Sequence, residues 1–494
     1  MKPARPVSVG FALTSEHSSF HAALGLARVL KDRGHDPVFF VNEATVFARM
    51  VRTHGYRLAT LPPGHDAHRA RPSPLASWRV VERLRRRARR IGDEQAFLRD
   101  AIRCNALDLC FLDAVRYDLY PFALALAKAG VPALLLSYTF ASRARCDYAP
   151  VFSSVPCRAT ARPALHTRVG HALRWTWAVA SRGHRTAFGR GEYARMVLAK
   201  ALEQVRNASF ERELRSLGLR SVWSEWKRRP DLPEVVFGHR ALDWPAAAGD
   251  PARHYLGATD RFRDEAPFDA SRLDPLRPVV YANLSTINGF QDIFATDGTR
   301  GRARPDLARR RFRIALRYVE GLVACFARRP EWQLLLACGP FLEQLKDAGA
   351  PPNVHLHERL PQLAVLARAD LAVTWGGAGT IRECINLGVP MVVLPAWTDQ
   401  FGNAARVAAA NVGVRGDLAG LTPATLTGLV ERALGDPGIR ASIRAMKAQC
   451  DPVQEVEALV RFVAERTGVA LSDLRGTAPA TGGDSAHTHP GPGH

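Results

Sequence analysis

Short apolar runs alternate with helical patterns through most of this chain, and this alternation most limits the folds open to it. From Val7 an apolar run leads through a polar loop into HAALGLARVLKDRGH, which ends at Gly34 and is followed by DPVFFV. LDLCFLDA, YPFALALAKAG and VPALLLSY repeat the order. Strands that are apolar throughout and separated by helices indicate a parallel sheet with both faces covered. We therefore predict a doubly wound α/β fold.

The alternation breaks once and then resumes, which predicts two domains in the 494 residues. The break is a looser region rich in Arg and Ala at 143–232, with Trp175, Trp177, Trp223 and Trp226. Beyond it come PVVYANLST, a long helical pattern and WQLLLACG. We place the N-terminal domain at 1–245, with 143–232 as a helical elaboration, and the C-terminal domain at 246–466. The Gly-, Pro- and His-rich stretch 467–494 is predicted to be a disordered tail.

The charge of the chain is strongly basic, but it decides little about partners. There are 68 Lys and Arg against 47 Asp and Glu, a formal charge of +21. The run ERLRRRARR at 82–90 is either a solvated helix face or a patch that touches an anionic membrane surface. No zinc-finger spacing or aromatic-interleaved RNA motif accompanies it. We expect no nucleic-acid partner and keep peripheral membrane contact as an alternative.

The cysteines and the N-terminal run favour a reduced, cytoplasmic protein. The eight cysteines include no C-x-x-C pair and no zinc-type spacing, so no metal site is expected. The apolar run from Val7 to Leu13 is too short for a secretory signal and is interpreted as the first strand. No stretch approaches the roughly 18 apolar residues of a membrane span.

The segment that carries chemistry is a strand, LAVTW, followed by a glycine-rich turn and the helix TIRECINLG. The turn contains Gly376, Gly377 and Gly379. Glycines let a backbone approach a ligand closely, and the first N–H groups of a helix attract anions. The pattern suits a phosphate, although such a turn alone also serves merely to bend the chain.

Polar residues near this turn extend the prediction to a nucleotide sugar. Glu383 lies one helical turn on, and Asp399 with Gln400 follows the next strand, VPMVVLP. All three are expected at the carboxyl edge of the sheet, where open α/β sheets bind ligands. For Glu383 there is an alternative, because Thr380-x-x-Glu383 also matches a capping box that serves only the helix end.

These motifs resemble the donor-binding signature of the UDP-glycosyltransferase-like family, which has the GT-B fold of two doubly wound Rossmann-like domains facing each other across a cleft. The matching positions are Pro361-Gln362, Trp375-Gly376-Gly377, Thr380, Glu383, Gly388-Val389-Pro390, Asp399-Gln400 and Asn403-Ala404. HYLGATD, VVYANLST with Thr286, the opening helix and the strand that carries Asp113 extend the likeness over most of residues 7–465, most loosely between 140 and 240.

The resemblance implies an inverting, metal-independent transfer of a sugar from a UDP- or dTDP-sugar to a hydroxyl of a small lipophilic or natural-product acceptor. Gln362 would contact the nucleoside and Glu383 the ribose, Thr286 and Thr380 the phosphates, and Asp399 with Gln400 the sugar. Amides of the Gly376 to Thr380 turn would stabilise the leaving group. No cofactor is implied beyond the nucleotide sugar itself.

The chain departs from the family pattern at two positions. Trp375 stands where the family has a His that contacts the diphosphate, and Ser19 stands where the family's general base, a His, precedes the opening helix. Serine is not a base at neutral pH unaided, so His17 is the candidate for a displaced dyad with Asp113. The alternative is that His17 and His21 are ordinary loop and helix residues without a catalytic role.

Three interpretations of function therefore stay open. The first is an active glycosyltransferase whose acceptor site is formed by the Trp-bearing region 143–232 and the loops of the first domain. The second is a catalytically impaired relative that binds a nucleotide sugar or a partner protein, favoured by Ser19 and Trp375. The third is a GT-B enzyme of another class, such as a nucleotide-sugar epimerase, which the long region 143–232 disfavours.

Overall fold

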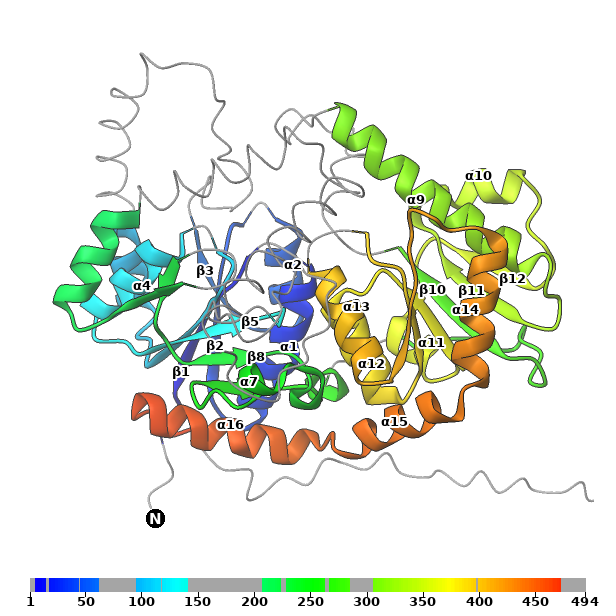
Figure 1. Ribbon diagram of the computed structural model, residues 1–494. Coiled ribbons are helices and arrows are strands. Elements are labelled where there is room, and N and C mark those ends of the chain that lie inside the picture. The colour runs from blue at the N-terminus through cyan, green and yellow to red at the C-terminus, as the bar shows by residue number, and fades with distance from the viewer. Residues whose placement is uncertain are drawn as a thin grey trace, which may run out of the picture.

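The first domain is built on a sheet of seven parallel strands. The computed structural model describes residues 5–14, 17–43, 45–61, 95–116, 118–140, 207–223, 228–262, 266–284, 305–396 and 399–471. The strand order in the first sheet is β3-β2-β1-β4-β5-β8-β9 (Figure 1). Its strands are β1 (Ser8–Ala12), β2 (Asp36–Val41), β3 (Arg57–Thr60), β4 (Leu109–Asp113), β5 (Ala133–Ser137), β8 (Glu234–Val236) and β9 (Arg253–Tyr255). The predicted parallel sheet is confirmed.

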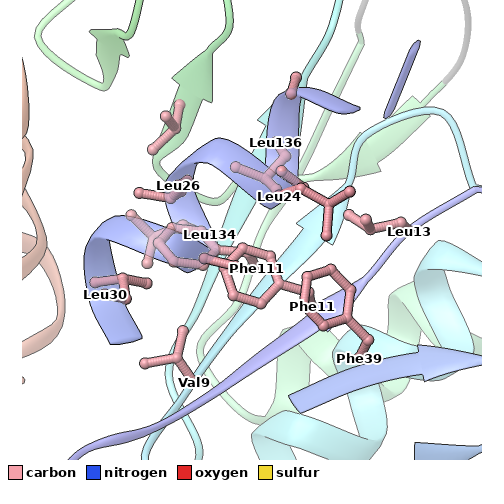
Figure 2. Close-up of a cluster of buried hydrophobic side chains, with 14 of the residues drawn as sticks. Val9, Phe11, Leu13, Leu24, Leu26, Leu30, Phe39, Phe111, Leu134 and Leu136 are labelled. Carbon is pink, nitrogen blue, oxygen red and sulfur yellow. The ribbon is translucent and has the colours of Figure 1, made fainter. Parts of the chain in front are cut away.

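Helices cover both faces of this sheet because its strands are apolar on both sides. They are α1 (His17–Asp32), α2 (Val46–Thr53), α4 (Leu119–Lys128), the short α7 (Pro245–Ala248) and helical stretches at 95–104 and 207–216. On the α1 face, Phe11, Phe39 and Phe111 from adjacent strands meet Leu26 and Leu30 of the helix (Figure 2). The Phe11 and Phe39 rings stack at 4.9 Å.

Three short pieces complete the described part of this domain. β6 (Ser221–Trp223) and β7 (Arg228–Pro230) form an antiparallel pair, and two 3₁₀ turns, Arg240–Leu242 and Thr259–Phe262, flank β9. The second of these turns belongs to the crossing between the two domains.

The second domain repeats the plan with six parallel strands in the order β12-β11-β10-β13-β14-β15. This order is the doubly wound arrangement of dinucleotide-binding folds, with a switch point between β10 and β13. The strands are β10 (Val279–Asn283), β11 (Gln333–Ala337), β12 (Val354–His357), β13 (Leu371–Thr374), β14 (Met391–Val393) and β15 (Gly413–Arg415). The helices are α9 (Pro305–Phe326), α10 (Leu342–Asp347), α11 (Gln362–Leu366), α12 (Ala378–Leu387), α13 (Gln400–Ala409), α14 (Pro423–Gly435), α15 (Pro437–Ala448) and α16 (Pro452–Thr467).

The structure moves the domain boundaries that the sequence suggested. The strand β9, which lies beyond the predicted boundary at 245/246, pairs with β8 in the first sheet. The helix α16 returns to the first domain, where Leu459 and Val463 join the core around α1 (Figure 1). Leu471 is buried in the same core, although the tail was predicted to begin at 467. The sequence missed this return because a helix pattern does not indicate which sheet it covers.

Several predictions fall on residues outside the described ranges. These are the basic run at 82–90, most of the region 143–232 with Trp175, Trp177 and Trp226, and the tail beyond 471. Within the described part of the chain, no helix combines the length and apolar character needed to cross a membrane.

A half-buried carboxylate joins α16 to the segment that connects the two domains. Glu455 accepts a hydrogen bond from the backbone N–H of Ala258 at 2.8 Å. Burial raises the pKa of Glu455 to about 7, although backbone N–H groups of Ala258 and Gly257 oppose the rise. The folded protein therefore keeps this proton over a range of pH in which the unfolded chain releases it.

This pKa predicts a pH dependence that Glu455→Gln removes. Because the raised folded-state pKa favours the protonated form, stability falls as pH rises from about 4.5 through about 7. We expect Glu455→Gln to be more stable than the wild type at pH 8, by on the order of 2 kcal/mol, and to match it near pH 5. Urea unfolding of both proteins between pH 5 and 8 measures the difference, and parallel pH profiles would contradict the assignment.

Candidate functional site

The glycine-rich turn leaves β13 and enters α12 in the conformation that an anion site requires. Gly376 has φ +87°, and a Cβ there would lie 2.6 Å from Val393 Cγ1, so only glycine fits. Gly377 is the N-cap of α12 and offers no side chain to its first N–H groups. A Cβ at Gly377 or Gly379 would meet no described atom within 4 Å. The first amides of α12 are therefore open to a ligand on that side.

The helix α13 holds this turn in place through Asn403. Its Nδ2 donates to the carbonyl oxygen of Gly376 and to Asp399 Oδ2, both at 2.9 Å. Asp399 is the half-buried N-cap residue of α13, so its carboxylate lies beside the turn. The sequence motif includes Asn403, but its role as the support of the turn became visible only in the structure.

Gln362 and Glu383 form a hydrogen-bonded cluster next to the turn. Gln362 Oε1 accepts from Tyr281 Oη at 2.9 Å and from Asn283 Nδ2 at 2.6 Å. Its Nε2 donates to Glu383 and, at 3.3 Å, to Thr380 Oγ1. The predicted site residues Gln362, Thr380 and Glu383 are thus brought together at the carboxyl edge of β10 and β13.

The capping-box alternative for Glu383 is wrong. The helix begins at Ala378 with Gly377 as its N-cap, so Thr380 lies inside the first turn and cannot be the N-cap residue. The Glu383 carboxylate accepts the amide of Gln362 instead.

Trp375, which was predicted to belong to the donor site, has its side chain in the core of the second domain. Trp375 is 1% exposed and packs edge-on against Tyr318 of α9, with ring centroids 5.5 Å apart. It continues the alternation of Leu371 and Val373, which face the same core. This strand periodicity was the sequence signal that indicated an inward-facing indole, away from the turn.

Gln400, which was predicted to contact the sugar, is buried at the start of α13. The side chain is 1% exposed, and its Oε1 accepts the backbone N–H of Ala396 at 3.0 Å. Gln400 therefore orders the loop before α13, and Asp399 is the member of the pair that lies nearer the surface.

In the first domain, Asp113 joins the ends of two neighbouring strands. Asp113 is 0% exposed, with Oδ2 accepting from Thr14 N at 3.0 Å and Oδ1 from Val115 N at 2.9 Å. Burial raises the pKa of the Asp113 carboxyl, while these backbone donors and the guanidinium of Arg116 oppose the rise. Arg116 itself pairs with Asp118 at 2.6 Å and donates to the carbonyl of Leu13.

The candidate bases lie at the start of α1, three to five residues after Thr14. The helix begins at His17, so His17 occupies the helix N-terminus without any shift of the loop. Its side chain lies outside the described part of the structure, and the predicted dyad with Asp113 stays a prediction. Ser19 is buried inside the first turn of α1. Thr286 lies outside the described ranges.

Tyr138 is a candidate site residue that the sequence did not single out. It follows β5, next to the strand that ends in Asp113, and its ring stacks on Phe237 with centroids 5.2 Å apart. The hydroxyl is buried and has no hydrogen-bond partner among the residues that the structure describes. Its only sequence signal was a tyrosine just beyond the carboxyl end of a buried strand.

Among the described residues, no three His, Cys, Asp or Glu side chains are grouped as a metal ion would need. The predicted polar site residues with described side chains lie at two sheet edges. They are the turn with Gln362, Glu383 and Asp399 in the second domain, and Asp113 in the first. This arrangement suits an anionic, hydroxyl-rich ligand on the second domain.

Comparisons with known proteins find similarity to glycosyltransferases. Residues 342–460 match the family described as erythromycin biosynthesis protein CIII-like, C-terminal domain. The chain is 37% identical over 130 residues to the oleandomycin glycosyltransferase of Streptomyces antibioticus, covering 26% of this chain and 30% of that protein. It is 32% identical over 222 residues to the demethyllactenocin mycarosyltransferase of Streptomyces fradiae, covering 44% and 41%. The matches thus span less than half of either relative.

Solved structures extend the likeness to both domains. A calicheamicin glycosyltransferase superposes with a TM-score of 0.56 at 19% identity, over 94% of this chain and 99% of that one. A glycosyltransferase solved in complex with dTDP gives a TM-score of 0.54 at 18% identity, over 93% and 100%. At these identities the likeness shows the fold, which is GT-B. The fold and the family match over residues 342–460 of the second domain make the chain similar to the UDP-glycosyltransferase-like family.

Proposed function

We propose that the protein transfers a sugar from a UDP- or dTDP-sugar to a hydroxyl of a small lipophilic acceptor, with inversion and without a metal ion. The observation that carries the proposal is the uncapped start of α12 behind Gly376, with Glu383 and Asp399 beside it. The relatives named above are glycosyltransferases of natural products, and one structural neighbour is a dTDP complex.

Each donor-side group has a chemical task in this proposal. Amides of Gly377 to Thr380 receive the diphosphate, and the positive end of the helix dipole stabilises the charge that grows on the leaving group. Glu383 and Gln362 offer an acceptor and a donor to the ribose and nucleoside. Asp399 accepts from sugar hydroxyls, while Gln400 and Trp375 support the fold around them.

On the acceptor side, His17 takes the proton from the attacking hydroxyl. Asp113 orients the imidazole and stabilises its positive charge, and the oxygen then attacks the anomeric carbon opposite the leaving diphosphate. The unpartnered hydroxyl of Tyr138, beside the strand of Asp113, offers a hydrogen bond to the acceptor.

Nucleotide binding tests the donor site. We expect isothermal titration to show that the wild type binds UDP or dTDP, and that Gly376→Ala weakens this binding at least tenfold. The reason is that alanine resists a φ of +87° and its Cβ would meet Val393 at 2.6 Å. Incubation with the matching nucleotide sugar should release the diphosphate slowly even without an acceptor.

The matched control is Gly428→Ala, at a helical position in α14 where a Cβ meets nothing within 4 Å. It should bind the nucleotide as the wild type does. The proposal fails if the wild type binds neither nucleotide, or if folded Gly376→Ala binds as tightly as the wild type.

A further inference from the structure

A buried chain of five charged side chains runs from the first domain into the second. Arg229 pairs with Glu234 at 2.7 Å, and Arg253 lies 3.4 Å from the same carboxylate. Arg253 also pairs with Asp243 at 3.0 Å, and Asp243 pairs with Arg406 at 3.0 Å. All five side chains are buried. Arg406 is the only one of the five that the second domain contributes.

The charges show that Arg406 is not needed to neutralise the carboxylates. Within the first domain, the two guanidiniums of Arg229 and Arg253 already balance the two carboxylates of Glu234 and Asp243. Although burial disfavours its ionisation, those two guanidiniums lower the pKa of Glu234 to about 2. Arg406 is thus the third guanidinium beside two carboxylates in this chain of charges. A buried charge is costly unless it is paired and hydrogen-bonded.

Apart from a hydrogen bond of 3.4 Å to the carbonyl of Gly402 in its own helix, the described contacts of Arg406 are with the first domain. Its Nε and one terminal nitrogen bind Asp243 Oδ1 at 3.1 and 3.0 Å. Its guanidinium lies 4.9 Å from the ring of Trp244 and 5.1 Å from that of Phe140, both in the first domain. Two rings and a carboxylate of one domain therefore enclose a cation of the other.

Arg406 and Asn403 are three residues apart on α13 and share one side of the helix. Asn403 holds the carbonyl of Gly376, and Asp399 lies at the start of the same helix. In Figure 1, α13 and α12 lie on the side of the second sheet nearest the first domain. Whatever fixes α13 therefore also fixes the turn.

We infer that Arg406 is a positioning residue for the turn at Gly376: its contacts with Asp243, Trp244 and Phe140 anchor α13 to the first domain, and Asn403 transmits this anchoring to the turn. The inference deepens the proposed function, on which it rests for the identity of the ligand.

Hydrogen exchange of the ligand-free protein tests the inference without relying on catalysis. Arg406→Met keeps the length of the side chain and leaves Asp243 with Arg253 and Tyr255, so the fold should persist. We expect amides in 376–387 and 399–409 to exchange at least tenfold faster, while those of β1 stay unchanged. Arg406→Lys, which retains the charge without the paired donors, should show the same pattern with a smaller increase. The lysine variant also tests the inference if Arg406→Met fails to fold.

The matched control is Arg466→Met, which replaces an exposed arginine of α16. Amide exchange in 376–387 and 399–409 should be the same in this variant as in the wild type. In Arg406→Met, the affinity for UDP or dTDP should fall about tenfold. Unchanged exchange in the two stretches, or an equal increase throughout the chain, would overturn the inference. If the wild type binds no nucleotide, the proposed function fails, whereas the exchange result still decides the role of Arg406.

Discussion

Replacing Arg382 with methionine is expected to lower the free energy of unfolding by about 3–5 kcal/mol. Arg382 lies on α12 and binds Asp260, in the segment between the domains, through two hydrogen bonds of 2.6 Å. Both side chains are buried, so the substitution leaves a carboxylate in the interior without its guanidinium. Asn386, one turn further along α12, binds the Gly257 carbonyl at 2.9 Å and cannot supply the missing charge. Urea unfolding followed by circular dichroism measures the loss.

Two further variants show whether the charge pair is the cause. Arg277→Met removes an ion pair with Asp274 in which both side chains are about half exposed, and it should cost at most about 1 kcal/mol. Adding Asp260→Asn to Arg382→Met should recover part of the stability, because no buried charge then lacks a partner. A loss of less than about 1 kcal/mol in Arg382→Met would show that the pair does not stabilise the domain junction.

The second large effect is expected on catalysis: Asp113→Asn should reduce kcat by about 10²- to 10⁴-fold. The buried carboxylate would orient the base and stabilise its positive charge, and an amide does neither. Donor affinity should stay within about twofold of the wild type, because the nucleotide is proposed to bind the other domain. Steady-state kinetics and dTDP or UDP titration separate the two quantities.

Histidine variants test whether Asp113 acts through a base on α1. His17→Ala should reduce kcat to a similar extent, and the double variant should be no slower than either single one, because the pair acts as a unit. His21→Ala is the control and should retain most activity. Thermal unfolding must accompany these measurements, since asparagine can accept only one of the two backbone bonds at Asp113. Full activity in folded His17→Ala would remove it as the base.

Much of the second domain was predictable because its signals are local. The apolar run Leu371–Thr374, the glycines after it and the helix that follows indicate a strand, a tight turn and an open helix start from neighbouring residues alone. Asp113 was likewise placed at the end of a buried strand. The burial of Trp375 was also predictable, since strand alternation with Leu371 and Val373 turns the indole into the core.

Other features depended on contacts between residues far apart in the sequence. The buried ion pairs of Arg382 and Arg406 join residues more than 100 positions apart. The strand β9 and the helix α16 have sequence patterns that would fit either domain, yet both pack on the first. An arginine in a helix has the same pattern whether it faces solvent or a buried carboxylate. The sequence thus determined the strands, the helices and the glycine-rich turn, because backbone preference and periodicity are local. Only the tertiary structure decided how the domains are joined, because a buried charge is recognised only by its partner in space.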